Sequence, residues 1–211
     1  MNGKFYELPE EKRLRIINAG FEVFGQSDYR HASTEQIAAK ADISKGLLFY
    51  YFHDKKTLYL FLFEYAANRI KEHVVDARLS EITDFFELSA YAAERKCQML
   101  RESPFIMAFI MRAFYSQREA VSDAIRSKVQ AETAAIYGTY FSKINYSKFR
   151  EDISPQDIFQ MLTWLIDGYL HEKQDAGLPV ELGDVMDKYR LWSSLLKKVS
   201  YKEEFLNGRS H

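Results

Sequence analysis

The sequence predicts an all-α protein of about nine helices, and three observations lead to this fold class. Its 211 residues include only 9 Gly and 4 Pro, fewer turn residues than an all-β sandwich or a glycine-rich nucleotide-binding fold needs. Apolar residues make up 47% and aromatic residues 15%, which excludes a disordered chain and supplies ample material for a core. Helix-start signals follow one another along the chain with only short gaps between them.

Other classes of protein are excluded by single features. Cys97 is the only cysteine, so the chain is not a disulfide scaffold. Residues 1–15 mix acids and bases without an apolar run, so they do not form a signal peptide. The longest apolar run, residues 105–111, is far shorter than the ~20 residues that span a bilayer. We therefore expect a cytoplasmic protein.

The first helix is expected from about Pro9, in the first turn, to Phe24. Apolar residues at i, i+3, i+7 and i+10 share one face of it: Leu14, Ile17, Phe21 and Phe24. Residues 25–28 form the loop that follows.

Two short helices and a tight turn are expected next. Ser33 and Gln36 form a capping box, which starts a short helix with Ile37, Ala38 and Ala41 on its apolar side. Ser44 is the next N-cap candidate, so residues 41–43 must turn tightly, and Asp42 is expected in a left-handed conformation. Leu48, Tyr51 and Phe52 face inward from the helix that follows, and Asp54 caps the next one. This is a helix-turn-helix arrangement braced by a longer helix.

The rest of the chain also has helical patterns. Further helices are expected over residues 55–78, 81–101, 104–116, 118–144, 155–174 and 183–199, with a polar loop over 145–152.

A set of residues at fixed spacing runs through the predicted helix-turn-helix: Ile16-Ile17, Ala19, Phe24, Tyr29, Ser33-Thr34, Ile37-Ala38, Ala41, Ile43-Ser44-Lys45-Gly46, Leu48-Phe49-Tyr50-Tyr51-Phe52, Lys55 and Leu58. In order and spacing this set resembles the TetR family of bacterial transcriptional regulators over residues 15–58, about the first quarter of the chain. The remainder resembles that family only in being helical and of suitable length. Four positions depart from the family pattern: Gly20, Glu35, Asp42 and Phe49.

The resemblance implies a domain organisation and a function. It implies a DNA-binding domain over residues 1–56, with its motif over about 33–52, and a larger helical effector-binding and dimerisation domain over 57–211. It further implies a dimeric, sequence-specific DNA-binding regulator, in the usual mode of the family a repressor. An apolar or amphipathic small molecule would release it from a palindromic operator.

The candidate DNA contacts follow from how a helix-turn-helix docks, with the start of its second helix in the major groove. The N-terminal amides of that helix carry partial positive charge and bind phosphate. Lys45 is the candidate for direct contact with guanine or phosphate, Gly46 permits close approach, and Tyr50 faces outward. The full candidate set is Thr34, Ser44, Lys45, Gly46, Phe49, Tyr50, Tyr51 and Lys55, although Tyr51 is also expected to pack inward.

The charge of the chain does not by itself indicate a DNA-binding surface. The formal net charge of the chain is −1, and residues 1–56 carry nine basic and eight acidic residues, a balance of +1. No basic footprint of the kind that marks a DNA-binding tail is present, so the DNA-binding hypothesis depends on pattern rather than on charge.

The last two long helices are the candidate dimer interface. Apolar residues cover more than half of the circumference of the helix over 155–174, as expected for a helix buried on two sides. The candidate interface residues are Ile158, Leu162, Leu165, Tyr169, Tyr189, Trp192 and Leu196. A monomer that buries both helices internally is the alternative.

The middle of the chain, residues 81–144, is rich in aromatic residues and methionine. Such side chains form the walls of apolar ligand pockets, and they also form ordinary cores. The candidate pocket residues are Phe86, Met99, Phe109, Phe114, Tyr137, Phe141 and Trp164. No cofactor and no metal site is expected.

The sequence lacks the motifs that would indicate an enzyme rather than a DNA-binding regulator. The sequence has no glycine-rich phosphate loop, no HExxH motif and no paired cysteines, and its five histidines are scattered. We therefore expect a protein that is not an enzyme. The remaining alternative is a helical small-molecule-binding or scaffold protein without functional operator binding.

Overall fold

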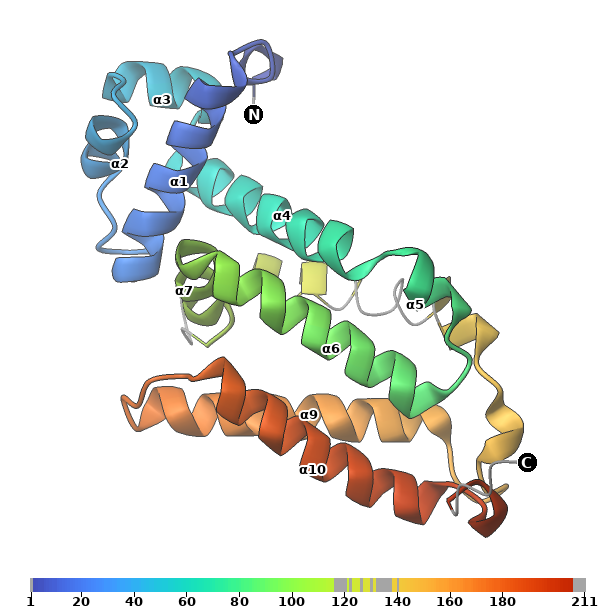
Figure 1. Cartoon of the computed structure of the whole chain (residues 1–211). Coiled ribbons are helices and arrows are strands. Elements are labelled where there is room, and N and C mark those ends of the chain that lie inside the picture. The colour runs from blue at the N-terminus through green and yellow to red at the C-terminus, as the bar shows by residue number, and fades with distance from the viewer. Residues whose placement is uncertain are drawn as a thin grey trace. The chain divides into compact units, whose positions relative to one another are not determined.

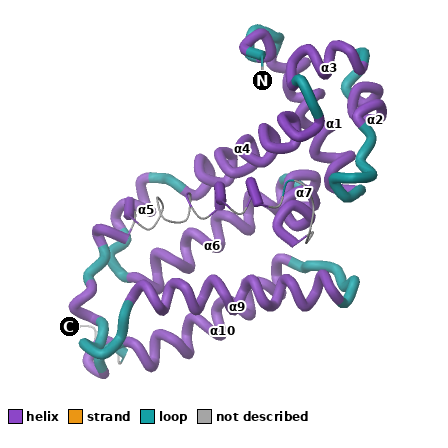
Figure 2. The backbone as a smooth tube through the Cα atoms, turned by 180° about the vertical axis from the view of Figure 1, so that it is seen from behind, coloured by secondary structure: helices purple, strands orange, loops and turns teal. Residues whose placement is uncertain are grey.

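The computed structural model describes residues 2–115, 121, 123–125, 127–129, 131, 138–139 and 141–206. Within these residues the regular secondary structure is helical, as the backbone view in Figure 2 shows. The predicted all-α fold class is therefore confirmed. No helix in the described part of the chain is long and apolar enough to cross a membrane.

The chain divides into two compact units. Unit 1 consists of Met1–Glu72 and Met99–Thr133, and unit 2 of His73–Gln98 and Ala134–His211. The predicted division into a DNA-binding domain over residues 1–56 and an effector-binding domain over 57–211 concerns function, and it stays a prediction.

Unit 1 contains the predicted helix-turn-helix. Its elements are η1 (Gly3–Phe5), α1 (Glu10–Gln26), α2 (Thr34–Lys40), α3 (Lys45–Phe52), most of α4 (Lys55–Val74) and α7 (Pro104–Tyr115). Figure 1 shows α1, α2 and α3 gathered at the N-terminal end of α4. Phe21 and Phe24 of α1 are fully buried and lie 5.3 and 6.3 Å, between ring centroids, from Phe109 of α7.

The structure of α1 follows the predicted pattern with two differences. Ile17, Phe21 and Phe24 are buried as expected, whereas Leu14, at the start of the same face, is 37% exposed. Pro9 occupies the N-cap rather than the first turn. A Cβ on Gly20 would lie 2.6 Å from the side chain of Leu62 in α4, so the glycine permits the close approach of α1 and α4.

Unit 2 is built from α5 (Ala77–Glu81), most of α6 (Phe85–Glu102), η2 (Phe141–Lys143), η3 (Tyr146–Lys148), α9 (Pro155–Asp175), α10 (Leu182–Ser200) and η4 (Glu203–Phe205). Figures 1 and 2 both show α9 and α10 side by side and antiparallel. Its core is aromatic: Phe85, Phe86, Phe141, Phe149 and Tyr201 are buried in one cluster.

Three predicted element boundaries were wrong for local reasons. The helix expected over 55–78 ends at Val74, because the Asp76 carboxylate accepts a hydrogen bond from the amide of Leu79 and starts α5 instead. The helix expected from residue 81 begins at Phe85, after the capping residue Asp84. The expected polar loop over 145–152 contains η3 and the buried Phe149, which forms an isolated bridge with Tyr201.

The helix expected over 118–144 falls largely outside the described residues. Its last part, Phe141–Lys143, is a 3-10 helix.

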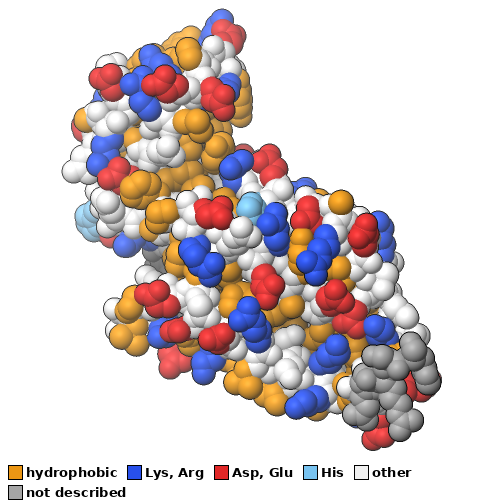
Figure 3. All heavy atoms as spheres, viewed as in Figure 1, with side chains coloured by type: hydrophobic (Ala, Val, Ile, Leu, Met, Phe, Trp, Pro, Cys, Tyr) orange, Lys and Arg blue, Asp and Glu red, His pale blue; other side chains and the backbone are white. Residues whose placement is uncertain are grey.

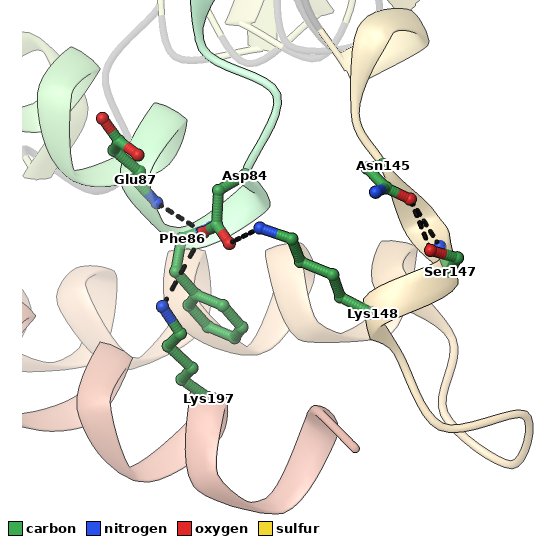
Figure 4. A network of polar contacts seen from close by, with 7 residues as sticks. All are labelled: Asp84, Phe86, Glu87, Asn145, Ser147, Lys148 and Lys197. Atoms are coloured by element: carbon green, nitrogen blue, oxygen red, sulfur yellow. Dashed lines mark hydrogen bonds and ion pairs between the residues drawn. The ribbon is translucent and has the colours of Figure 1, made fainter. Parts of the chain in front are cut away.

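A buried carboxylate joins three segments of unit 2 (Figure 4). Asp84 accepts hydrogen bonds from the amides of Phe86 and Glu87, both at 3.1 Å. Its other oxygen lies 2.8 Å from Nζ of Lys148, and Nζ of Lys197 lies 3.9 Å from the carboxylate. Burial alone would raise the pKa of Asp84, but the hydrogen bond from Lys148, the amide of Glu87 and the charge of Lys197 hold that pKa below its ordinary value. Asp84 therefore links the start of α6 to η3 and to the end of α10.

Candidate nucleic-acid interface

The turn between α2 and α3 has the geometry that the sequence predicted. Asp42 adopts φ +55°, which confirms its expected left-handed conformation. The amide of Ile43 donates to the carbonyl of Ala38 at 3.0 Å, and the amide of Asp42 donates to the carbonyl of Ala39 at 3.1 Å. These two bonds form a Schellman motif, which ends α2 sharply and leaves only residues 41–43 between α2 and Ser44, the cap of α3.

Side chains cap the helices on both sides of this turn as predicted. Ser33 accepts from the amide of Gln36 at 3.3 Å, and Ser44 accepts from the amide of Leu47 at 3.1 Å. Asp54 accepts from the amide of Thr57 at 2.7 Å at the start of α4, and this bond lowers the pKa of Asp54. The boundaries of the helix-turn-helix are thus set by short polar side chains next to the helix starts.

Helix α3 presents one polar, exposed side and one buried side. Ser44, Lys45 and Gly46 at its N-terminus are exposed, and the ring of Tyr50 is 52% exposed. Leu48 and Phe52 are fully buried. The exposed side of α3 therefore offers backbone amides, an ammonium group and a phenol to a partner.

Two other candidates on α3 are less accessible. Phe49 is half-buried, and its ring centroid lies 5.7 Å from Nζ of Lys45. Tyr51 is only 6% exposed, with its ring 5.8 Å from that of Phe5. Its burial favours the core role over a contact with DNA.

Lys45 is engaged by a carboxylate from α2. Its Nζ donates to Oε1 of Glu35 in a short ion pair. This hydrogen bond, with those from the Glu35 amide and the Ser33 hydroxyl, lowers the pKa of Glu35 to about 2. The sequence marked both residues separately but gave no signal that their side chains meet.

The two candidates that flank α3 also have partners within the chain. Thr34 is buried, and its hydroxyl lies 3.5 Å from Oε2 of Glu35. Nζ of Lys55 donates to the carbonyl of Arg30 at 3.2 Å and lies 5.0 Å from the ring centroid of Tyr29.

The N-terminal segment holds the far end of α3, which the sequence analysis missed. The amide of Asn2 donates to the carbonyl of Tyr51 at 2.7 Å, so it satisfies a backbone acceptor at the C-terminus of α3. Phe5 is 1% exposed, and its ring lies 4.9 Å from that of Phe52 and 5.3 Å from that of Phe61. Two aromatic residues just before Pro9 are the only signal that could have indicated this anchor.

Charges of both signs are interspersed over the face of the molecule that Figure 3 shows. Within the helix-turn-helix, acidic groups accompany the basic ones: Glu22 lies 2.7 Å from Nζ of Lys40, and Asp42 lies 3.8 Å from Arg15. This distribution agrees with the balanced charge of residues 1–56.

The predicted pocket residues are distributed over both units. Met99 and Phe109 are buried in unit 1, whereas Phe86 and Phe141 are buried in the aromatic core of unit 2. Trp164 is 64% exposed on α9. The side chain of Phe114 and all of Tyr137 lie outside the described residues.

The predicted dimer residues divide into a buried and an accessible group. Ile158, Leu162 and Tyr189 are 4 to 8% exposed, so their own chain already covers them. Leu165 is 39% exposed, and Tyr169, Trp192 and Leu196 are half-buried. Four apolar side chains outside the candidate set are more exposed than these: Met161, Leu191, Leu195 and Val199, at 44 to 55%.

The described residues contain no group of three or more side chains suited to hold a metal ion. The fold and the site define the class of protein: an all-α chain that carries an N-terminal helix-turn-helix with an exposed recognition-type helix.

Comparison with known proteins finds similarity in the N-terminal part of the chain. Residues 16–61 match the family model described as bacterial regulatory proteins, tetR family. A segment of 91 residues is 34% identical to the HTH-type transcriptional regulator HbdR of Aromatoleum sp. (strain CIB). That segment is 43% of this chain and spans 36% of the length of HbdR. Residues 16–61 are therefore similar to the helix-turn-helix of TetR family regulators.

Solved structures support the same fold beyond the helix-turn-helix. A TetR family transcriptional regulator from Chloroflexus aurantiacus J-10-fl is similar over 96% of this chain and 99% of its own, with a TM-score of 0.66 and 20% identity. FadR from Bacillus subtilis, solved in complex with stearoyl-CoA, is similar over 88% of this chain and 98% of its own, with a TM-score of 0.69 and 17% identity. At these identities the likeness concerns the fold alone.

Proposed function

We propose that this chain is a dimeric, sequence-specific DNA-binding regulator that represses transcription and is released from a palindromic operator by an amphipathic small molecule. The observation that carries the proposal is the exposed N-terminal side of α3, with Ser44, Lys45, Gly46 and Tyr50, placed by a sharp turn after α2.

The exposed side of α3 has the chemistry that major-groove contact requires. Its free N-terminal amides and the Lys45 ammonium group are donors for phosphate oxygens or for guanine O6 and N7. Gly46 adds no side chain between the backbone and a partner, and the Tyr50 ring is placed to contact a thymine methyl group or a phosphate. Lys55 and Thr34 would position the adjoining backbone of the duplex.

A single short helix contacts only a few base pairs, so operator binding needs two copies with their recognition helices about 34 Å apart. Six apolar side chains on α9 and α10 are exposed in the single chain and support a dimer through these helices: Met161, Trp164, Leu165, Leu191, Leu195 and Val199. A patch of this kind marks a surface that a partner covers. We place the interface on these residues rather than on the buried Ile158, Leu162 and Tyr189.

The proposed effector is a long-chain acyl-CoA thioester or a molecule of similar amphipathic character. Two observations support this class: the aromatic side chains of the middle helices, and the fold shared with FadR, which was solved with stearoyl-CoA. An effector of this kind acts only if it binds the DNA-incompetent conformation more tightly than the DNA-bound one. Typical coupling of about 1–3 kcal/mol would change operator affinity 5- to 150-fold.

The experiment is a selection of duplexes from random DNA by the full-length chain at two salt concentrations. The proposal predicts recovery of a palindrome whose affinity decreases as the salt concentration rises. Stearoyl-CoA is then titrated against the complex, with free coenzyme A as the matched control, and release only by the thioester supports the effector class. The selection is repeated with protein that has been unfolded and refolded to remove any bound molecule. If this protein also enriches no sequence, the result would instead favour a small-molecule-binding or scaffold protein.

A further inference from the structure

We propose that Glu35 is an internal competitor of DNA for Lys45, and that it lowers binding to non-specific DNA more than binding to the operator. The inference deepens the proposed function and rests on it. It starts from one juxtaposition: the carboxylate of Glu35, at the start of α2, lies against the candidate DNA contact at the start of α3.

The Glu35 carboxylate accepts from three donors of the helix-turn-helix. Oε1 accepts from Nζ of Lys45, and Oε2 accepts from the hydroxyl of Ser33 at 3.0 Å and lies 3.5 Å from that of Thr34. Two of these three donors, Lys45 and Thr34, are the groups expected to contact DNA. The carboxylate therefore occupies the position, relative to these donors, that a phosphate oxygen would take.

The pair is on the surface, where a duplex can reach it. The side chain of Lys45 is 48% exposed and that of Glu35 is 62% exposed. An exposed ion pair contributes little to stability, so a phosphate can displace the carboxylate. Displacement leaves Glu35 without its cation and close to the anionic backbone of the duplex, which opposes binding.

The carboxylate remains ionised wherever the protein is folded under ordinary conditions. The hydrogen bond from Lys45 is the largest cause that lowers the pKa of Glu35 to about 2. Competition by Glu35 is therefore present across the physiological pH range.

The competition acts unequally on the two modes of DNA binding. Non-specific binding comes almost entirely from phosphate contacts, and a neutral Lys45–Glu35 pair contributes little to them. Operator binding also gains from hydrogen bonds between α3 and the base edges. Removal of the Glu35 charge should consequently strengthen non-specific binding and lower the ratio of the affinity for the operator to the affinity for random DNA.

The test is equilibrium binding of the full-length chain to the selected operator and to a scrambled duplex of equal length, over a series of salt concentrations. Four forms are compared: wild type, Glu35→Gln, Lys45→Met and the double variant. Glu72→Gln is the matched control, because it changes the net charge equally and removes an exposed carboxylate that is paired with Arg69 at 3.4 Å on α4. Far-UV circular dichroism checks that every form is folded.

Glu35→Gln is expected to bind the scrambled duplex about two- to tenfold more tightly at low salt. Its slope of log affinity against log salt should steepen by about 0.9, the value for one additional neutralised phosphate. Both effects should disappear in the Lys45→Met background and be absent in Glu72→Gln.

Each other outcome overturns the inference, and the outcomes differ in what they say about the proposed function. Operator binding by the wild type with unchanged scrambled-DNA affinity in Glu35→Gln shows that Glu35 does not compete. If Glu35→Gln binds the operator more weakly than the wild type at every salt concentration, Glu35 instead accepts a hydrogen bond from a base such as cytosine. Binding of no duplex by any form overturns the proposed function as well.

Discussion

Within each unit, single buried residues stabilise the packing, and Phe5 is the clearest example in unit 1. Its ring is 1% exposed among those of Tyr51, Phe52 and Phe61, so it fixes the C-terminal end of the recognition helix from outside the helix-turn-helix.

Phe5→Ala should therefore lower the free energy of unfolding of unit 1 by about 3–5 kcal/mol, because it leaves a cavity against α3. Urea denaturation measures this loss. Tyr6→Ala is the control, since the neighbouring Tyr6 is 58% exposed and should cost less than about 1 kcal/mol. Equal losses from both variants would show that Phe5 does not anchor α3.

Asp84 is the corresponding residue of unit 2. Asp84→Asn removes the charge that pairs with Lys148 and Lys197, and we expect it to cost about 1–3 kcal/mol at pH 7. The pKa of Asp84 in the folded chain lies below its ordinary value of 3.8, so its ionisation stabilises the fold above that pH. This stabilisation is lost as the pH falls through the lowered pKa.

The measurement is urea denaturation of wild type and Asp84→Asn from pH 7 to pH 3. The two stabilities should differ most at pH 7 and converge at the acid end. A constant difference over the whole range would mean that the Asp84 charge does not matter and that only the shape of the side chain does.

At the scale of elements, the sequence predicted helices well wherever a capping side chain and an apolar period coincide. Helices α2 and α3 begin directly after their predicted caps, Ser33 and Ser44. Helices α1, α9 and α10 lie within two residues of their expected bounds, although α1 and α10 have no hydrogen bond from a capping side chain. Boundaries were wrong where an aspartate interrupts an apolar period that would otherwise continue, as Asp76 does between α4 and α5. The spacing of apolar residues cannot show such a break, because the break depends on which backbone amide the aspartate carboxylate binds.

The approach of α1 to α7 gives a prediction at the same scale. A Cβ on Gly25 would lie 3.1 Å from Cβ of Ala108 and 3.2 Å from the backbone nitrogen of Phe109. Gly25→Ala should destabilise the fold by about 1–3 kcal/mol through overpacking, even though alanine favours helices.

The control for this variant is Gly183→Ala in α10, where nothing lies within 4 Å of the added Cβ. That change should be neutral or stabilise the fold by up to about 1 kcal/mol. Thermal unfolding of both variants compares them, and a stabilised Gly25→Ala would contradict the close packing of α1 against α7.

At the scale of the whole molecule, the all-α fold and the helix-turn-helix were predictable from the sequence, but the side-chain partners were not. The spacing from Ile16 to Leu58 identifies the helix-turn-helix, whereas the meeting of Glu35 with Lys45 depends on the angle that the turn imposes between α2 and α3. The interface prediction had the same weakness. Apolar periodicity does not separate Leu162, which its own chain buries, from Leu195, which it leaves 52% exposed.

The exposed residues of α9 and α10 give the prediction for assembly. Leu195→Glu should convert the proposed dimer to a monomer, because it places a charge in the centre of an apolar interface. Sedimentation velocity measures the change in mass. Phe105→Glu, at a side chain that is 47% exposed on α7, should leave the dimer intact, and dissociation by both variants or by neither would reject this interface.

The central claim is that α3 reads DNA, and the most direct test is the equilibrium affinity of wild type and of Lys45→Ala/Tyr50→Ala for the selected palindrome. We predict that the double variant remains a folded dimer and binds the palindrome at least about tenfold more weakly, since each lost contact is worth about 1–3 kcal/mol. Unchanged affinity in the double variant would contradict this claim, because it would mean that the exposed side of α3 is not the surface that contacts the operator.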